Sequence, residues 1–156
     1  MTIMTVRGPI DDGELGVTQP HEHLLINLYG TVMVWNYSAF EDESLAIDEL
    51  ASFTAAGGRS IVETTTIGIG RQPEGLRRIS EATGVNIVMG TGWYREAVYP
   101  DYVARSSVDQ LADRLVGDIV DGVDGTGVRA GVIGEIGTEV EFDDHRAMVG
   151  SRRTNP

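Results

Sequence analysis

The sequence predicts an α/β fold with a parallel sheet, and three observations carry the prediction. Short β-branched and apolar runs alternate with amphipathic stretches in the order β-α-β-α-β-α-β. The later strand runs are almost continuously apolar, as in a sheet that is covered on both faces. The length of 156 residues suits one domain. Two architectures fit this pattern, a doubly wound open sheet and half of a (β/α)8 barrel, since a full barrel takes about 250 residues.

Four strands are expected, at residues 15–20, 60–65, 85–90 and 129–136. The second is rich in β-branched residues, which favour strands. The first ends at the pair of histidines His21 and His23, and the fourth contains Glu135. Because parallel strands place their carboxyl ends together, these polar residues are expected at one end of the sheet.

Three helices are expected between the strands. The first spans residues 44–56 and stops at Gly57. The second begins at Pro73, a residue favoured at the first helical position, and stops at Gly84. The third has capping-box spacing between Ser107 and Gln110. Its apolar stripe consists of Val108, Leu111, Ala112, Leu115, Val116, Ile119 and Val120.

The chain divides into a part with alternating strands and helices, residues 1–142, and an irregular tail, residues 143–156. The tail has little apolar periodicity and ends in GSRRTNP. We expect it to be poorly ordered. The third histidine of the chain, His145, lies in this tail, and we predict no role for it.

Composition excludes several functional classes. The formal charge is −12, from 24 acidic and 12 basic residues, which disfavours binding to nucleic acid or to an anionic membrane surface. No cysteine is present, so thiolate chemistry and disulfides are excluded. No lysine is present either, which excludes Schiff bases and carbamylated-lysine metal bridges. Because the sequence has no apolar run of membrane length and no signal peptide, we expect a cytoplasmic protein.

The strongest chemical signal is the pair His21 and His23 at the end of the first strand. Residues i and i+2 of a strand point to the same face, so both imidazoles can reach one cation. Glu22 points the other way and is expected to be structural. The alternative is that the two histidines are ordinary surface residues.

A second signal is Glu135, a carboxylate within the apolar run VIGEI. Burying a carboxylate is costly unless it is paired or bound to a metal. Glu135 is therefore a candidate oxygen ligand that can bridge two cations. The alternative is a glutamate at a strand end that meets solvent.

Three further residues are candidates for a substrate pocket. Trp93 and Tyr94 follow the third strand, where ligand sites form in both architectures. They either line an apolar pocket or cover the end of the barrel. Arg71 either holds a substrate anion or pairs with an internal carboxylate such as Glu63. The nearby glycines lack the full spacing of a nucleotide-binding loop.

Four segments together resemble the phosphotriesterase family of the amidohydrolase superfamily. They are GVTQPHEHL at 16–24, IVETTT at 61–66 with the GR pair at 70–71, GTGWY at 90–94 and RAGVIGEIG at 129–137. The resemblance implies a (β/α)8 TIM barrel with two divalent cations, most often zinc. It also implies that His21 and His23 hold the more buried cation. Glu135 stands where many members have a carbamylated lysine, so the sequence resembles the phosphotriesterase-homology branch.

The function implied is hydrolysis of a small ester, lactone or phosphoester by a metal-bound hydroxide. The family's other ligands, two histidines and an aspartate, come from strands five, six and eight, beyond the four strands expected here. We therefore predict a truncated chain that is inactive on its own and self-associates through the exposed half-barrel. It offers no catalytic residue besides the metal ligands His21, His23 and Glu135. The alternatives are a non-catalytic metal-binding fragment or an acidic interaction module from a disrupted gene.

Overall fold

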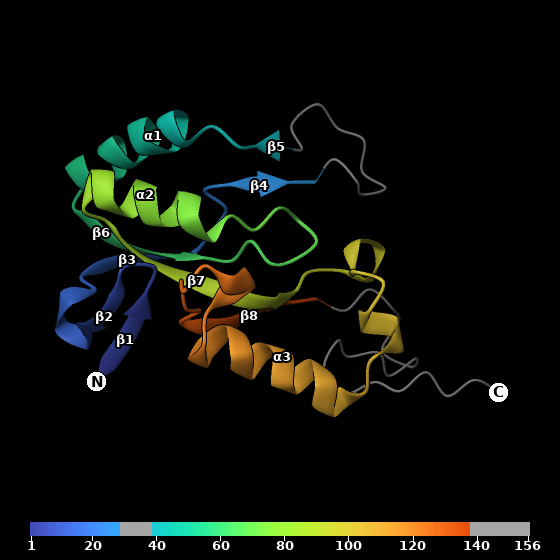
Figure 1. Ribbon diagram of the computed structural model, residues 1–156. Coiled ribbons are helices and arrows are strands. Elements are labelled where there is room, and N and C mark those ends of the chain that lie inside the picture. Colours follow the sequence, from blue (N-terminus) through green and yellow to red (C-terminus); the bar gives the residue numbers. More distant parts are fainter. Residues whose placement is uncertain (29–38, 138–156) are drawn as a thin grey trace.

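The computed structural model describes residues 1–28 and 39–137. Its centre is a parallel sheet of four strands, β3 (Val17–Glu22), β6 (Gly58–Glu63), β7 (Asn86–Trp93) and β8 (Val132–Ile136). Their order in the sheet is β3-β6-β7-β8, which is also their order in the sequence (Figure 1). In a doubly wound sheet, the chain returns to the middle of the sheet and adds later strands on the other side of the first one, so the spatial order differs from the sequence order. The sheet is therefore half of a (β/α)8 barrel, as the resemblance implied.

Three helices connect these strands, α1 (Glu43–Ala55), α2 (Pro73–Thr83) and α3 (Val108–Val120). The start and end of α2 and the start of α3 lie where the sequence indicates, whereas α1 begins and ends one residue earlier than the expected 44–56. Pro73 is the first residue of α2, and Gly84 ends it in the left-handed conformation. Ser107 and Gln110 form both bonds of the expected capping box. The start of α1 differs by one residue, because Asp42 caps it by accepting bonds from the backbone N–H groups of Ser44 and Leu45.

The core lies between the sheet and the first two helices. Leu50 of α1, Leu76 and Ile79 of α2, and Ile61 and Ile87 of the strands are all buried in one cluster. A second, smaller cluster joins the end of β7 to α3. The apolar stripe expected on α3 is only partly covered. Val116 and Val120 are 56% and 55% exposed, because they lie on the side of α3 that faces away from the second cluster.

An antiparallel hairpin, β1 (Thr2–Thr5) and β2 (Gly8–Asp11), was not predicted from the sequence. It lies at the end of the sheet opposite to that toward which β7 points (Figure 1), and the backbone N–H of Val6 donates to the carbonyl of Ile87 at 2.9 Å. A second short pair, β4 (Ile26–Asn27) with β5 (Ala39–Phe40), follows β3.

Short 3-10 turns complete the fold. They are η1 (Asp12–Glu14), η2 (Glu96–Val98), η3 (Val103–Arg105) and η4 (Val123–Gly125). Within the described ranges, no helix is long and apolar enough to span a membrane. The tail predicted at 143–156, including His145, lies outside the described residues.

Candidate metal centre

Three side chains from the two outer strands of the sheet meet at its carboxyl end. His21 lies near the end of β3, His23 just follows it, and Glu135 belongs to β8. One ligand atom from each residue lies within 4.8 Å of the others. His21 Nε2 is 3.4 Å from His23 Nε2 and 3.0 Å from Glu135 Oε1. The convergence expected from the sequence is therefore present.

The donor set fits a divalent cation. Two nitrogens bound tetrahedrally to zinc at 2.0–2.1 Å are about 3.4 Å apart, and the two Nε2 atoms are separated by 3.4 Å. The second carboxylate oxygen of Glu135, Oε2, is buried and has no hydrogen-bond partner among the described residues. A buried carboxylate oxygen without a partner is costly, and a bound cation would compensate that cost. Two imidazoles and a carboxylate are also a common zinc donor set.

The environment of His23 favours the neutral imidazole that binds metals. Burial lowers the pKa of His23, and the neighbouring His21 lowers it further, against the opposing charges of Glu135 and Glu22. Glu22 has the structural role that the sequence suggested. Its side chain accepts from the backbone N–H of His23 at 2.9 Å, and its carbonyl accepts from the backbone N–H of Thr64 at 2.9 Å.

Sequence reasoning did not identify the two residues behind His23. Thr65 Oγ1 lies 3.0 Å from His23 Nδ1, the ring nitrogen that points away from Glu135 and His21. The same hydroxyl donates to Glu63 Oε1 at 2.5 Å, and Glu63 is fully buried. Burial raises the pKa of Glu63 to about 8, against the bonds that it accepts from Thr65 and from the backbone N–H of Leu24. A glutamate at the end of an apolar strand, followed by three threonines, was the available signal.

Glycines on β7 allow β8 to lie close to it, and this position of β8 brings Glu135 to the two histidines. The expected third strand ended at Gly90, but β7 continues to Trp93. A Cβ atom at Gly90 would collide with the carbonyl oxygen of Gly134, and one at Gly92 with the carbonyl oxygen of Glu135. The GTG motif is therefore part of a close strand contact and not a loop.

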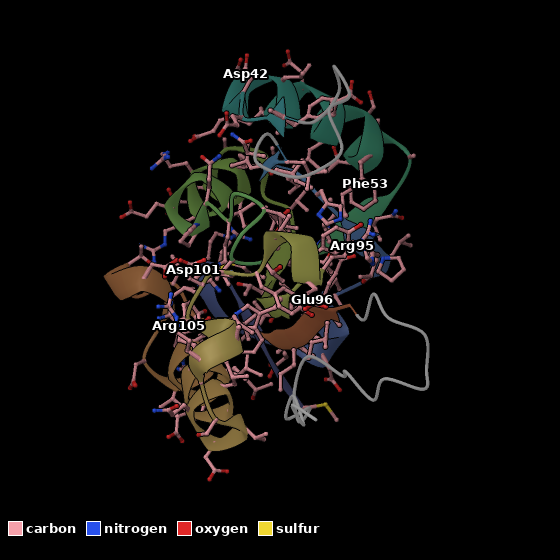
Figure 2. The ribbon with its side chains drawn as sticks, turned by 90° about the vertical axis from the view of Figure 1, so that its right-hand side faces the viewer. Asp42, Phe53, Arg95, Glu96, Asp101 and Arg105 are labelled. Atoms are coloured by element: carbon pink, nitrogen blue, oxygen red, sulfur yellow. The ribbon has the colours of Figure 1, made fainter. Side chains whose placement is uncertain are left out.

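The end of the sheet toward which β7 points faces the viewer in Figure 2, where Glu96 marks η2, Arg95 directly precedes it and Arg105 belongs to η3. Trp93 was a candidate for the pocket wall or for a cover of the barrel end. The structure places it in the second core cluster with Val103, Leu111 and Leu115, at 1% exposure. Its Nε1 donates to the hydroxyl of Tyr102 at 2.9 Å. This position favours the covering role.

Tyr94, the next candidate, is only partly buried. Its ring centroid lies 5.9 Å from the guanidinium carbon of Arg95, a cation–π contact. A place for Tyr94 in the substrate pocket remains a prediction.

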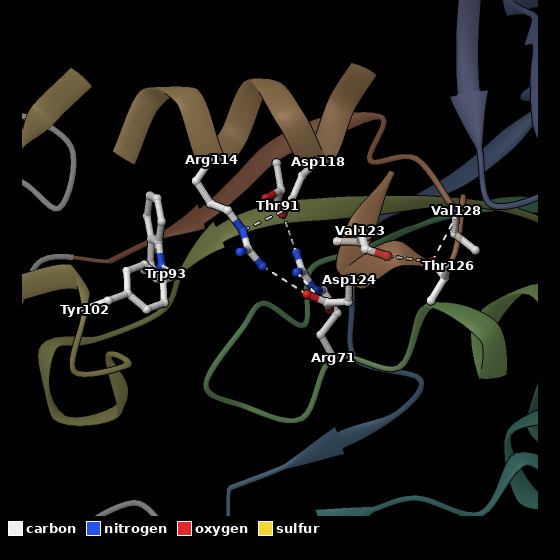
Figure 3. A network of polar contacts seen from close by, with 10 residues as sticks. All are labelled: Arg71, Thr91, Trp93, Tyr102, Arg114, Asp118, Val123, Asp124, Thr126 and Val128. Atoms are coloured by element: carbon white, nitrogen blue, oxygen red, sulfur yellow. Dashed lines mark hydrogen bonds and ion pairs between the residues drawn. The ribbon is translucent and has the colours of Figure 1, made fainter. Parts of the chain in front are cut away.

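Arg71 does not pair with Glu63, which was the internal partner that the sequence suggested. Its Nη1 donates to Asp118 at 2.8 Å and its Nη2 to Asp124 at 3.1 Å, with 2% of the side chain exposed (Figure 3). Asp118 also accepts from the hydroxyl of Thr91 at 2.6 Å, and Arg114 contacts both aspartates. The two Nη groups of the guanidinium thus contact internal carboxylates, which is the second of the two roles left open for Arg71, with partners other than Glu63. A place for Arg71 in the substrate pocket remains a prediction. The network joins β7, α3 and η4.

Comparison with known proteins gives one consistent family. The sequence profile described as "Phosphotriesterase family" matches residues 1–149. The N-acetyltaurine hydrolase of Tetraodon nigroviridis is 37% identical over 165 residues, which are 87% of this chain and 47% of the relative. The human N-acetyltaurine hydrolase is 36% identical, over 86% of this chain and 47% of the relative. The chain therefore spans about half the length of the curated relatives that it matches.

Solved structures agree with this result. A resiniferatoxin-binding protein from Rhodobacter sphaeroides is 41% identical, with a TM-score of 0.78 over 86% of this chain and 46% of that one. A phosphotriesterase homology protein from Escherichia coli, complexed with phosphate in its active site, is 34% identical, with a TM-score of 0.74 over 83% and 44%. The half-barrel described above is thus also found within longer proteins of known structure.

Proposed function

This chain belongs to the phosphotriesterase family, a family of divalent-metal hydrolases, and from that premise we propose that His21, His23 and Glu135 hold a catalytic zinc ion. One observation carries the proposal. Three donor atoms from opposite edges of the sheet converge within 4.8 Å, and the remaining oxygen of Glu135 is buried without a partner among the described residues. That oxygen suits a ligand shared between two cations.

Hydrolysis is the reaction that this site supports. A divalent cation supplies two kinds of chemistry when bound, since it lowers the pKa of a water molecule and polarises the oxygen of the bond under attack. The chain's own residues prepare the site for it. Burial keeps His23 neutral and ready to donate a lone pair, and Glu135 provides the negative charge that balances the cation.

The substrate we propose is a small molecule with an electrophilic carbonyl or phosphoryl centre. Relatives of this chain are named for N-acetyltaurine, which carries an amide carbonyl, and for lactones and organophosphorus compounds. The class therefore covers carboxylic esters, lactones and phosphoesters, and N-acyl amides join it through these relatives. These substrates share an oxygen that a cation polarises.

We further propose that the chain on its own binds zinc weakly and does not turn over substrate. The part of the chain that the structure describes holds one histidine and carboxylate cluster, which supplies three ligands. The resemblance implies that the rest of a two-metal site comes from later strands. Apolar residues are also exposed at both edges of the sheet, with Val17 at 66% and Ile133 at 53%. These edges offer a surface for self-association.

Calorimetric titration of the purified chain with Zn²⁺ tests the ligand assignment. Saturable binding is expected for the natural chain, and it should disappear when His21 and His23 are both replaced by alanine. His145→Ala is the matched control, because it removes the third imidazole of the chain and should leave the affinity unchanged. Equal affinity in the double variant and the natural chain would overturn the assignment.

Activity is tested with the zinc- and manganese-loaded chain against N-acetyltaurine, a panel of lactones and an activated phosphotriester. No turnover above the rate of free metal is expected from the chain alone. Turnover that is lost in Glu135→Ala would instead mean that copies of the chain complete the site by assembly.

A further inference from the structure

Behind His23 runs a continuous chain of polar contacts that ends on a buried carboxylate. His23 Nδ1 lies 3.0 Å from Thr65 Oγ1. Thr65 Oγ1 in turn lies 2.5 Å from Glu63 Oε1. The other carboxyl oxygen of Glu63, Oε2, accepts a hydrogen bond from the backbone N–H of Thr65 at 3.2 Å, which fixes the carboxyl group. Thr65 is 1% exposed and Glu63 is fully buried, so water does not compete for these contacts.

We propose that Thr65, backed by Glu63, is a positioning residue that keeps the hydrogen of His23 on Nδ1 and thereby leaves Nε2 free to bind the cation. This inference rests on the proposed metal site and adds to it the residues that prepare one of its ligands. Neither Thr65 nor Glu63 contacts the cation in this arrangement.

The direction of the hydrogen bonds follows from the donors available. Above about pH 8 the carboxyl of Glu63 is ionised. An ionised carboxylate only accepts, so the hydroxyl of Thr65 donates its single hydrogen to Glu63. The oxygen of Thr65 then has only lone pairs to offer His23, and Nδ1 must carry the hydrogen. In the neutral imidazole the other nitrogen, Nε2, is left as an acceptor. Nε2 is the atom that lies 3.4 Å from His21 Nε2 and faces the site.

The arrangement also fixes the orientation of the ring. Metal-bound histidines usually donate their second N–H to a carboxylate, a carbonyl or a water, and loss of that partner typically costs 10–100-fold in metal affinity. In this chain a threonine hydroxyl is interposed between the imidazole and the carboxylate. His21, by contrast, is an exposed residue, and its ring nitrogen Nε2 faces His23 and Glu135. His23 is therefore the ligand whose orientation the protein fixes, through contacts to the ring nitrogen that faces away from the cation.

The test uses Thr65→Val, which keeps the shape of the side chain and removes the hydroxyl, and Thr65→Ser, which restores the hydroxyl. Thr64→Val is the matched control. Thr64 is a buried neighbour whose hydroxyl donates to the carbonyl of Glu22 at 3.3 Å and not to a histidine. If Thr65→Val does not fold, Thr65→Ala replaces it in the comparison with Thr65→Ser.

The first readout is the tautomer of His23 in the metal-free full chain, from the ¹⁵N chemical shifts of its ring nitrogens at pH 9, where Glu63 is ionised. The natural chain, Thr65→Ser and Thr64→Val should show hydrogen on Nδ1, whereas Thr65→Val should show a mixture of both tautomers. The second readout is the affinity for Zn²⁺ at the same pH, measured by competition with a chelator that keeps the metal in solution. It should fall 10–100-fold in Thr65→Val and stay within about threefold of the natural value in the other two variants.

The outcomes separate this inference from the metal assignment. If zinc binds the natural chain and is lost in the double histidine variant, but Thr65→Val changes neither tautomer nor affinity, the positioning role is wrong and the metal site stands. If the natural chain does not bind zinc, the metal assignment fails, and the tautomer measurement still decides whether Thr65 controls His23. A loss of affinity in Thr64→Val equal to that in Thr65→Val would also overturn the positioning role.

Discussion

Glu135 Oε1 lies 3.0 Å from His21 Nε2, although the two residues belong to strands at opposite edges of the sheet. Three strand-to-strand steps of about 4.8 Å would separate these edges by roughly 14 Å in a flat sheet. The sheet must therefore curl strongly for the two side chains to meet, as it does in a barrel. The candidate metal centre is thus a product of the curvature, and variants that alter how β7 and β8 pack should alter it.

The first prediction concerns the close contact at Gly92. Replacing Gly92 with alanine puts a Cβ atom into the carbonyl of Glu135, so β8 must shift. We expect a loss of about 1–3 kcal/mol in the free energy of unfolding, measured by urea denaturation, together with weaker Zn²⁺ binding. Gly117→Ala on α3 is the control, since an added Cβ there meets nothing within 4 Å. It should be neutral or stabilising by up to about 1 kcal/mol. A stable Gly92→Ala chain with full zinc affinity contradicts the role of this contact.

The second prediction concerns the buried network around Arg71. Replacing Asp118 with alanine removes the carboxylate that faces the Nη1 of Arg71 and the hydroxyl of Thr91. A buried guanidinium is then left with only part of its charge compensated, which typically costs about 3–5 kcal/mol. Chemical denaturation measures the loss. Asp113→Ala, an exposed position on the same helix, should change stability by less than about 0.5 kcal/mol. Equal effects of the two variants would show that the network does not stabilise the fold.

The third prediction follows from the raised pKa of Glu63. Its pKa is about 8 in the folded chain, against 4.5 for an ordinary glutamate. Between these values the folded chain keeps a proton that the unfolded chain has released. The stability contributed by the protonated carboxyl is therefore fully present below about pH 4.5 and is lost as the pH rises to about 8. The total change is at most about 5 kcal/mol.

Urea denaturation of the metal-free chain at several pH values between 5 and 8 measures this effect. As the pH rises, the natural chain should lose unfolding free energy relative to Glu63→Gln, because glutamine does not titrate. Contributions from the histidines are common to both chains and cancel. Glu81→Gln, at an exposed position, should run parallel to the natural chain. Parallel curves for Glu63→Gln as well would show that Glu63 does not take up a proton on folding.

The fourth prediction concerns the start of α3. The hydroxyl of Ser107 accepts from the backbone N–H of Gln110, and the Gln110 side chain accepts from the backbone N–H of Ser107. Ser107→Ala removes one of these bonds and should lower the free energy of unfolding by about 1 kcal/mol. Ser52→Ala, at an exposed position within α1, should not destabilise, because alanine has the higher helix propensity. If both variants unfold at the same denaturant concentration, the cap contributes nothing.

Local features of this protein followed from its sequence. Pro73, Gly84 and the Ser107–Gln110 box marked helix ends correctly, because helix termination depends on groups a few residues apart. The alternation of strands and helices gave the parallel sheet, and strand periodicity placed His21 and His23 on one face. The family resemblance, carried by short motifs, chose the barrel over the doubly wound sheet. The hairpin of β1 and β2 was missed, since its stability depends on contacts with β7, which is distant in the sequence.

The sequence by itself thus determined the order of the elements, most of the helix ends and the candidate metal ligands at the strand ends. Only the tertiary structure decided which side chains meet. It joined Glu135 to His21 across the curled sheet, placed Thr65 and Glu63 behind His23, and paired Arg71 with Asp118 and Asp124 in place of Glu63. The physical reason is that periodicity fixes the direction of a side chain within its own element. Its partners depend on the curvature of the sheet and the packing of helices, which are set by contacts between residues far apart in the chain.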